Sequence, residues 1–331
     1  MNKKNVALGI GGAIGAIIGV KLLTRAGTVE WKNVSDKVQH SENSHFVEID
    51  GATVHYQKFG DISNPTLLLI HGYTASTYVW KTVAPMLAAR HFHVVAVDLI
   101  GFGYSDKPAA FDYTIASQAR MIERLMNRLG IGKATVVGSS YGGAVAATLA
   151  LDYAERVEKL VLVGAVSNDE VLDNPLLKFA SIPLIGEILT PFVIDSKILS
   201  KSRMKKTFAP ANESLVTKER LESVLRPLKA KDAHYSVLAS ARNWDANRIS
   251  EDANLINQPT LLIWGEDDQI IPIHNGENLY DSIVHSRLVV LKNCGHLPQE
   301  EKPERFVALV NEFCRDRKGL IHAAESERLM P

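Results

Sequence analysis

Cysteine is scarce in this sequence, which has only Cys294 and Cys314 among its 331 residues. Two cysteines cannot form a disulfide framework, and these two lack metal-ligand spacing. A single disulfide between them is still compatible with the sequence. An excess of charge is also absent, because 37 Lys and Arg residues balance 37 Asp and Glu residues. A nucleic-acid partner bound through bulk positive charge is therefore excluded. With 46% hydrophobic and 22% charged residues, the chain has the composition of a globular protein rather than a disordered one.

Charge is missing altogether from one stretch of 16 residues, Asn5 to Val20. As a helix it would rise about 24 Å, and snorkelling of Lys21 would extend the apolar span toward the ~30 Å hydrocarbon core. We therefore expect a membrane anchor over residues 1–30, and a protein that is membrane-associated through this single segment. The flanking charges are nearly balanced and do not set its orientation. The alternative is a secretory signal cleaved near Ala26, which would make the protein secreted.

Glycine recurs every four residues inside this stretch, at Gly11, Gly15 and Gly19. On one face of a helix these small residues would let a second helix approach closely. The sequence thus predicts self-association through the N-terminal glycine-rich helix.

Short apolar runs alternate with helical stretches after residue 40. Strands buried on both faces have this pattern, so the runs predict a mostly parallel, doubly wound α/β sheet covered by helices. Segments near His45–Ile49 and Thr53–Lys58 alternate in polarity and suit an antiparallel edge. The six buried runs are Thr66–Ile70, Val94–Val97, Thr135–Val137, Leu160–Val163, Thr260–Ile263 and Leu288–Leu291.

One connection is much longer than an ordinary crossover. About a hundred residues separate Val163 from Thr260, and they contain helical pieces between prolines. We expect this insertion to form a helical cap over one end of the sheet. The predicted organisation is an anchor at 1–30, a first part of the core at 31–167, a cap at 168–250, a second part of the core at 251–318 and a tail at 319–331.

The clearest chemical motif is Gly138-x-Ser140-x-Gly142, which follows a buried run and opens a helix. A strand that turns sharply into a helix exposes a serine hydroxyl beside the backbone N–H groups of the helix N-terminus. Serine needs a base, and His296 follows the last apolar run. The base needs an acid, for which Asp267 and Asp268 after the preceding run are the candidates. The order Ser140, Asp, His296 is the one that this arrangement requires.

These motifs together resemble the α/β-hydrolase superfamily over residues 44 to 317. The resemblance implies Asp268 as the acid, backbone N–H groups of Tyr73 and Tyr141 as the oxyanion hole, and no metal or organic cofactor. It also implies that the motif residues His71 and Asp98 shape loops, and that Glu301 hydrogen-bonds backbone near His296. The motifs are His71-Gly72, Asp98-x-x-Gly101-x-Gly103-x-Ser105, the elbow, Gly265-x-x-Asp268-x-x-x-Pro272 and Gly295-His296.

Ser140 argues against the dehalogenase and epoxide hydrolase branches of the superfamily, which carry Asp at the elbow. Carbon–carbon bond hydrolases keep serine, but their elbow resembles Gly-Asn-Ser-Met-Gly-Gly and Trp follows their histidine, where this chain has Ser139 and Leu297. Haloperoxidases and perhydrolases share the triad and generally lack so long a cap. These two groups stay as alternatives, as does a hydrolase-fold ligand receptor or signalling partner with little turnover.

Three motifs together look like those of membrane-anchored monoacylglycerol lipases: Ile263-Trp264-Gly265, Asp268-Gln269 and Asn293-Cys294-Gly295-His296. This resemblance implies a carboxylic ester hydrolase of the esterase or lipase type, acting on lipid-like esters such as monoacylglycerols or medium-chain acyl esters. A basic run in the cap, residues 197–206, carries five Lys or Arg residues and no acid. Such a run is commonly a solvated helix face, and beside apolar residues it also suits a membrane surface.

Overall fold

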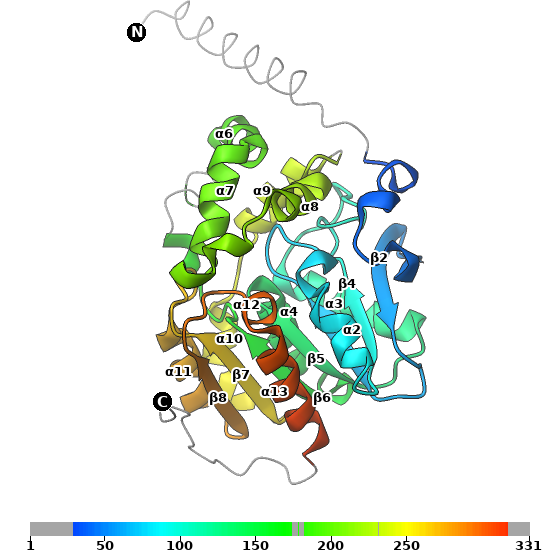
Figure 1. The fold of residues 1–331 in the computed structure, drawn as a ribbon, viewed down its shortest axis with the longest axis vertical. Helices are drawn as coiled ribbons and strands as arrows, with labels where there is room; N and C mark the ends of the chain where they lie inside the picture. Colours follow the sequence, from blue (N-terminus) through cyan, green and yellow to red (C-terminus); the bar gives the residue numbers. More distant parts are fainter. Residues whose placement is uncertain (1–28, 174–177, 179–181, 231, 317–331) are drawn as a thin grey trace, which may run out of the picture.

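The chain folds around one eight-stranded sheet in a computed structural model that describes residues 29–173, 178, 182–230 and 232–316 (Figure 1). The strand order is β1-β2-β4-β3-β5-β6-β7-β8; the pairs β1–β2 and β2–β4 are antiparallel, and all neighbours from β4 to β8 are parallel. The predicted α/β-hydrolase fold with a mostly parallel sheet and an antiparallel edge is therefore confirmed. The strands are β1 (Ser44–Ile49), β2 (Ala52–Phe59), β3 (Thr66–Ile70), β4 (His93–Val97), β5 (Ala134–Ser139), β6 (Val157–Val163), β7 (Thr260–Gly265) and β8 (Ser286–Leu291).

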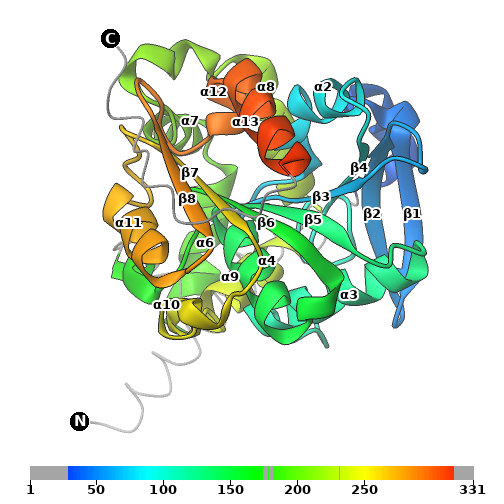
Figure 2. The same cartoon turned by 90° about the horizontal axis from the view of Figure 1, so that it is seen from below.

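Helices cover both faces of the sheet, which explains why its central strands are apolar throughout (Figure 2). On one face α2 and α13 pack on alternate strand residues such as Leu67 and Leu69. On the other face α3, α4, α10 and α11 pack on the intervening residues, such as Leu68 and Ile70. The core helices are α2 (Val83–Ala88), α3 (Ile115–Arg128), α4 (Tyr141–Asp152), α10 (Asn247–Glu251), α11 (Ile273–Ser282), α12 (Pro298–Glu301) and α13 (Pro303–Arg315).

The α3 helix shows how local sequence sets these elements. Thr114 caps it, because its Oγ1 accepts the N–H of Ser117 at 3.1 Å. Apolar residues recur at three- and four-residue steps, so one face of the helix is buried against the sheet. The chain leaves the helix at Gly130, whose φ of +69° favours glycine.

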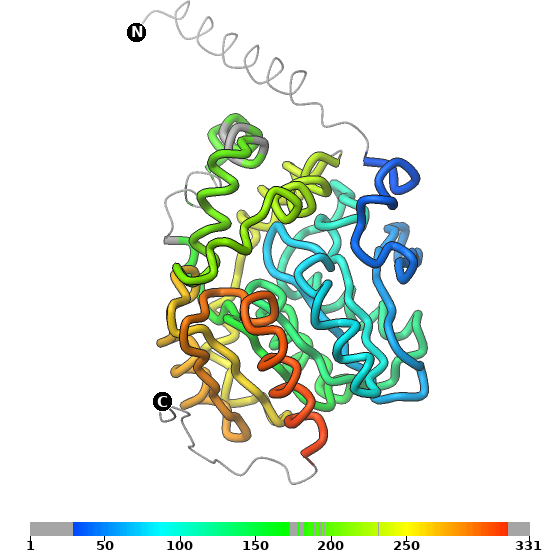
Figure 3. The backbone as a smooth tube through the Cα atoms, in the orientation of Figure 1, coloured from blue at the N-terminus to red at the C-terminus, as the bar shows by residue number. Residues whose placement is uncertain are grey.

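The connection from β6 to β7 forms a helical layer over the carboxyl end of the parallel strands (Figures 1 and 3). Among the described residues this connection contains no strand. Its helices include α6 (Ile185–Asp195), α7 (Lys197–Lys206), α8 (Lys218–Leu228) and α9 (Ala233–Arg242). The last α-helix before β7, α10, begins inside the predicted cap range 168–250 but packs on the core against α4 and α11. The division into domains stays a prediction.

The predicted membrane association through a single N-terminal segment requires correction. Among the described residues, no helix is both long enough and apolar enough to cross a bilayer. The longest described helix, α3, has 14 residues, whereas a spanning helix needs about 20. The predicted anchor at 1–30 falls almost entirely on residues 1–28, outside the described part of the chain. The cleavage site at Ala26 and the glycines proposed for self-association lie outside it as well.

Candidate active site

Ser140 occupies a sharp turn between a strand and a helix. Because β5 ends at Ser139 and α4 begins at Tyr141, Ser140 alone changes the direction of the chain. Its φ of 55° and ψ of −121° are unusual for a residue with a side chain, so the surrounding packing must hold it there. A Cβ at Gly138 would lie 2.2 Å from the carbonyl oxygen of Gly142, so only glycine fits beside this turn.

His296 and Asp268 come from the loops after β8 and β7. The Nδ1 atom of His296 lies 2.8 Å from Oδ2 of Asp268, and both side chains are buried. The Oδ1 atom accepts the N–H groups of Ile270 and Ile271 at 2.8 and 2.9 Å. Because an ionised carboxylate only accepts, the proton of the neutral imidazole belongs on Nδ1, and Nε2 keeps a lone pair. Such an imidazole is suited to act as a base through Nε2.

The structure separates the two acid candidates. Asp268 contacts His296, whereas no hydrogen bond or ion pair joins Asp267 to His296 among the described residues. The N–H of Asp267 instead donates to the carbonyl oxygen of Cys294 at 2.9 Å. The neighbouring Gly164 has a φ of +48°, and a Cβ there would lie 3.1 Å from both Asp268 Oδ2 and His296 Nδ1. A glycine therefore keeps this contact uncrowded.

Two cavities bring Ser140 and His296 to a common space. One has a volume of about 390 Å³ and the other about 320 Å³, and Ser140, His296, Tyr73, Thr207 and Ile270 line both. The cavities thus form two lobes that meet at the serine. The described hydrogen bonds do not include one between Ser140 Oγ and His296 Nε2, a contact that commonly tightens only when substrate is bound.

The smaller lobe lies under α7 and α8. It combines apolar residues with cationic ones, so it suits an apolar substrate that carries polar or anionic groups near one end. Its distinctive lining residues are Gly72, Thr74, Ala75, Val79, Ser139, Ser200, Arg203, Met204, Lys206, Arg220, Val224, Leu225, Leu228 and Leu297. The larger lobe lies toward α11 and combines apolar residues with five polar side chains that the smaller lobe does not share. Its distinctive lining residues are Val166, Ser167, Asn168, Glu170, Val171, Trp244, Gln269, Ile271, Pro272 and Asn275.

The residues predicted for the oxyanion hole flank Ser140 from two directions. Tyr141 is the first residue of α4, where an N–H group has no partner within the helix. Tyr73 follows Gly72, where a Cβ would lie only 3.0 Å from the Cβ of Ser140. The Tyr73 hydroxyl donates to the carbonyl oxygen of Val237 in α9 at 2.6 Å. The loop that carries Tyr73 is therefore tied to the helical layer above it.

His71 is held neutral beneath this loop. Its Nε2 accepts the N–H of Leu99 at 3.1 Å, so its proton is on Nδ1, which donates to the carbonyl oxygen of Gly72 at 2.7 Å. Burial lowers the pKa of His71, and the nearby Asp98 offsets this only in part. His71 thus shapes the loop, which agrees with the prediction from the sequence, and no described hydrogen bond joins it to Ser140 or His296.

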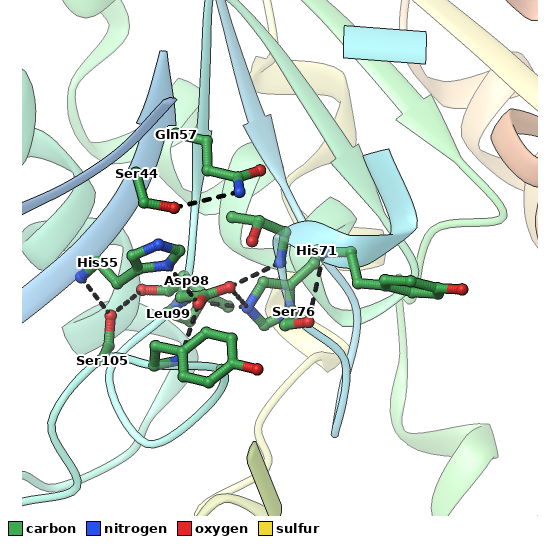
Figure 4. A network of polar contacts seen from close by, with 12 residues as sticks. Ser44, His55, Gln57, His71, Ser76, Asp98, Leu99 and Ser105 are labelled. Atoms are coloured by element: carbon green, nitrogen blue, oxygen red, sulfur yellow. Dashed lines mark hydrogen bonds and ion pairs between the residues drawn. The ribbon is translucent and has the colours of Figure 1, made fainter. Parts of the chain in front are cut away.

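Asp98 ties together the loops around His71 (Figure 4). Its carboxylate accepts the N–H of Thr77 at 2.6 Å, Nδ1–H of His55 at 2.7 Å and the N–H of Tyr104 at 2.8 Å. Burial acts to raise the pKa of Asp98, but His55 and the other donors hold it below its usual value. A Cβ at Gly103 would lie 2.0 Å from the Asp98 carboxyl carbon. The predicted structural role of Asp98 is confirmed.

The loop of His296 is fastened to the cap. The N–H of His296 donates to the carbonyl oxygen of Thr207 at 2.8 Å, directly after α7. Glu301 accepts the N–H of Gly295 at 2.9 Å through one oxygen and the N–H of Ala209 at 2.9 Å through the other. The expected contact of Glu301 with backbone near His296 is confirmed, and it also joins the cap to the core.

A second tie between cap and core is ionic. Arg220 of α8 forms a two-point contact with Glu300 of α12, at 2.7 and 3.2 Å, and Lys81 approaches the same carboxylate at 3.0 Å. Burial acts to raise the pKa of Glu300, but Arg220 and Lys81 together lower it below its ordinary value. Sequence reasoning missed this pair because its partners lie 80 residues apart.

Sequence reasoning also missed the aromatic wall beside the serine. The ring of Tyr141 lies 4.9 Å from that of Trp244 and 6.2 Å from that of Tyr73. Trp244 therefore lines the larger lobe as well as belonging to the core. The elbow motif located Tyr141, but no local pattern pointed from it to a tryptophan about a hundred residues later.

Neither cysteine is placed for nucleophilic chemistry. Both thiols are free, and burial raises the pKa of Cys294 and raises that of Cys314 to about 11. A thiol with a raised pKa is a poor nucleophile at neutral pH. In the part of the chain that the structure describes, no group of three or more His, Cys, Asp or Glu residues is arranged to hold a metal ion.

Comparisons with known proteins agree on the fold. The sequence pattern of the alpha/beta hydrolase fold family matches residues 65–184 and 199–303. A 2-hydroxy-6-oxononadienedioate/2-hydroxy-6-oxononatrienedioate hydrolase of Burkholderia vietnamiensis is 31% identical over 299 residues, which cover 85% of this chain and all of that protein.

Two solved structures are also similar to this chain. A meta-cleavage product hydrolase from Pseudomonas fluorescens is 27% identical with a TM-score of 0.68, over 82% of this chain and 98% of that one. A bacterial membrane phospholipase A is 26% identical with a TM-score of 0.69, over 94% of this chain and 98% of that one. The comparisons do not show the expected resemblance to monoacylglycerol lipases.

Proposed function

Because the chain belongs to the alpha/beta hydrolase family, we propose that it is a serine hydrolase that cleaves carboxylic esters, with lipid-like acyl esters as substrates. The observation that carries this proposal is the meeting of two lobes at Ser140 and His296, with Asp268 hydrogen-bonded behind the histidine. One lobe would hold the acyl chain and the other the alcohol part of the ester.

The proposed reaction uses only side chains and backbone of this chain. His296 Nε2 takes the proton of the Ser140 hydroxyl as its oxygen attacks the ester carbonyl. Asp268 stabilises the imidazolium that forms. The N–H groups of Tyr73 and Tyr141 hold the oxyanion, each contributing on the order of 3 kcal/mol. The alcohol leaves with the proton from His296, and water then cleaves the acyl-enzyme by the same route.

The lining of the lobes supports an ester with an apolar chain. The smaller lobe has an apolar wall formed by Val224, Leu225 and Leu228 of α8. The cationic side chains of Arg203 and Lys206 also line this lobe. The phospholipase A that the chain resembles is named for the cleavage of carboxylic esters in lipids, which agrees with this substrate class. Reaction at an ester needs no further group beyond those already described.

A second candidate is hydrolysis of a carbon–carbon bond in a 2-hydroxy-6-oxo-dienoate. The relatives from Burkholderia and Pseudomonas favour it, because their names assign that chemistry to them. Arg203 and Lys206 in the smaller lobe would suit a substrate carboxylate. Glu170 in the larger lobe is unsuited to the second carboxylate of a dienedioate. Ser139 and Leu297 also replace the Asn and Trp that such enzymes carry beside their serine and histidine.

A parallel assay separates the two candidates. Purified protein would be given p-nitrophenyl esters of graded chain length, a medium-chain monoacylglycerol and a 2-hydroxy-6-oxo-dienoate, with Ser140→Ala as the matched control. We expect kcat/KM for the best ester to exceed that for the dienoate at least a hundredfold. The opposite ranking would transfer the assignment to carbon–carbon bond hydrolysis. If the folded protein hydrolyses neither the esters nor the dienoate and does not react with a fluorophosphonate, we would assign it to the ligand receptors of this fold.

A further inference from the structure

Large apolar side chains that are exposed in the described structure gather most densely in one stretch of the chain, the first part of the helical layer. Of the eleven that are exposed there, five lie between residues 182 and 199, and the others are scattered between residues 46 and 284. Ile198 is 83% exposed and Leu184 is 61% exposed. A cluster of this kind on a folded protein marks an interaction surface more often than isolated exposed residues do. The five are Ile182, Leu184, Ile185, Ile198 and Leu199.

The cluster belongs to the tip of the cap. Its residues come from α6, α7 and the turn before α6, and these two helices contact each other. Figure 1 shows α6 at the end of the molecule that is remote from the lower ends of β7 and β8. We call the five apolar residues together with Lys197 and Lys201 the α6–α7 patch.

Positive charge predominates in the two helices of the patch, because residues 185–206 contain five Lys or Arg residues and two acids, Glu187 and Asp195. Residues 197–206 contain five Lys or Arg residues and no acid. Lys205 pairs with Glu213 at 2.5 Å, and Arg203 and Lys206 line the catalytic cavity. Lys197 and Lys201 remain as exposed cations next to Ile198 and Leu199. The acid in the first turn of α6, Glu187, is neutralised by a two-point contact with Arg242 at 2.8 and 2.9 Å.

One helix connects this patch with the catalytic cavity. Ser200, Met204 and Thr207 line the smaller lobe, on the inner side of α7. Ile198 and Leu199 are exposed on the same helix. A molecule lying against the patch would therefore be separated from the lobe by the width of one helix. This arrangement would let a molecule or surface bound at the patch also deliver substrate to the smaller lobe.

We propose that the α6–α7 patch is a docking site for the surface of an anionic lipid bilayer. The apolar side chains enter the boundary between headgroups and acyl chains, and Lys197 and Lys201 contact anionic headgroups. The contact is reversible and peripheral, and it requires no spanning helix among the residues that the structure describes. Charge complementarity favours lipid over a second copy of this chain, because a two-fold contact through the patch would bring like charges together. The proposal does not depend on which bond the active site cleaves.

The test uses the full chain and two kinds of vesicle, one of phosphatidylcholine alone and one with 30% phosphatidylglycerol. Binding would be measured by co-sedimentation for the parent protein, Ile198→Ser/Leu199→Ser, Lys197→Gln/Lys201→Gln and the control Ile62→Ser. Ile62 is 75% exposed but lies in the loop between β2 and β3. We expect binding to anionic vesicles to fall about 25-fold in the lysine variant, at about fivefold for each charge. The apolar variant should fall by at least tenfold, and Ile62→Ser should bind like the parent.

A local probe separates the patch from any other part of the chain that binds lipid. Leu199→Trp and Ile62→Trp would be mixed with anionic vesicles containing brominated acyl chains. The parent protein has four native tryptophans, and their quenching is the baseline. We expect the fluorescence of Leu199→Trp to be quenched more than this baseline, and that of Ile62→Trp to show no additional quenching. Equal quenching at both positions, or unchanged binding of both patch variants, would overturn the proposal. Concentration-dependent dimers that the Ile198→Ser/Leu199→Ser variant abolishes, without an effect of lipid, would assign the patch to a second copy instead. Circular dichroism and thermal unfolding of each variant check that it is folded, whatever bond the active site cleaves.

Discussion

The Nδ1 atom of His296 lies 2.8 Å from Oδ2 of Asp268, while Oδ1 of the same carboxylate is occupied by the N–H groups of Ile270 and Ile271. Both oxygens therefore have fixed partners, and the carboxylate has one orientation. This fixes the imidazole as well, with Nε2 directed away from the acid. The proposed division of roles between base and acid depends on that orientation.

The first prediction concerns the choice between the two neighbouring acids. Asp268→Asn should lower kcat for an ester by about 10³- to 10⁴-fold, because an amide that donates to Nδ1 would favour the wrong tautomer of His296. Asp267→Asn is the matched control and should change kcat less than twofold. Steady-state kinetics on a p-nitrophenyl ester would measure both. A large loss in Asp267→Asn with little loss in Asp268→Asn would reverse the assignment.

The second prediction concerns Asp98, which we regard as a positioning residue. In Asp98→Asn the side-chain amide would face two donors, Nδ1–H of His55 and the N–H of Tyr104, and one buried charge would be lost. We expect the free energy of unfolding to fall by about 3 kcal/mol. In the protein that remains folded, kcat should fall while KM changes little, because Thr77 and the loop of Tyr73 are held by this carboxylate. A change in KM alone would argue against an effect on the oxyanion loop.

The third prediction is a dependence of stability on pH. The pKa of Glu300 is lowered in the folded protein from its ordinary value of 4.5, by Arg220 and Lys81 against the effect of burial. A carboxyl group with a lowered folded pKa stabilises the fold fully above its unfolded pKa, and this contribution is lost as the pH falls through the folded pKa. The unfolding free energy should therefore drop below about pH 4.5.

Glu300→Gln tests this contribution directly. The variant should be about 3 to 5 kcal/mol less stable at neutral pH, because Arg220 is left buried without its charged partner. Its stability should also vary less between pH 3 and 5 than that of the parent protein, as measured by denaturant unfolding at each pH. A parallel loss of stability in both proteins over this range would assign the acid sensitivity to other carboxyl groups.

The fourth prediction concerns the thiols. Cys294 is two residues from His296, but burial raises its pKa, and the pKa of Cys314 is raised to about 11. Iodoacetamide at pH 7.5 should therefore leave ester hydrolysis unchanged, whereas a fluorophosphonate should abolish it. Mass spectrometry of the treated protein would show whether either thiol was alkylated. Inactivation that follows alkylation of Cys294 would point to a thiol in the site.

Much of the fold and site could be predicted because the signals are local. A strand buried on both faces is apolar throughout, so runs such as Leu160–Val163 could be assigned before their neighbours were known. The elbow around Ser140 is also local, because its glycines are required by contacts within the turn and with β3. The order of Ser140, Asp268 and His296 along the chain then follows from the order of the strands.

The remaining features depend on contacts between distant segments. Asp98 and His55 lie 43 residues apart, and Arg220 and Glu300 lie 80 apart, so no spacing in the sequence signals either pair. The wall formed by Trp244 and Tyr141 depends on how the cap sits on the core. Substrate class depends on these same surfaces, which is why the motif identified a hydrolase and not its substrate.

The central claim is that Ser140 forms an acyl-enzyme with a carboxylic ester. It is tested most directly by mixing the protein with a p-nitrophenyl ester, quenching with acid within one turnover and locating the acyl group by peptide mass spectrometry. We expect a burst of p-nitrophenol, an acyl group on Ser140, and neither of these in Ser140→Ala. Continued turnover of the ester by Ser140→Ala, or an acyl group on another residue, would contradict it.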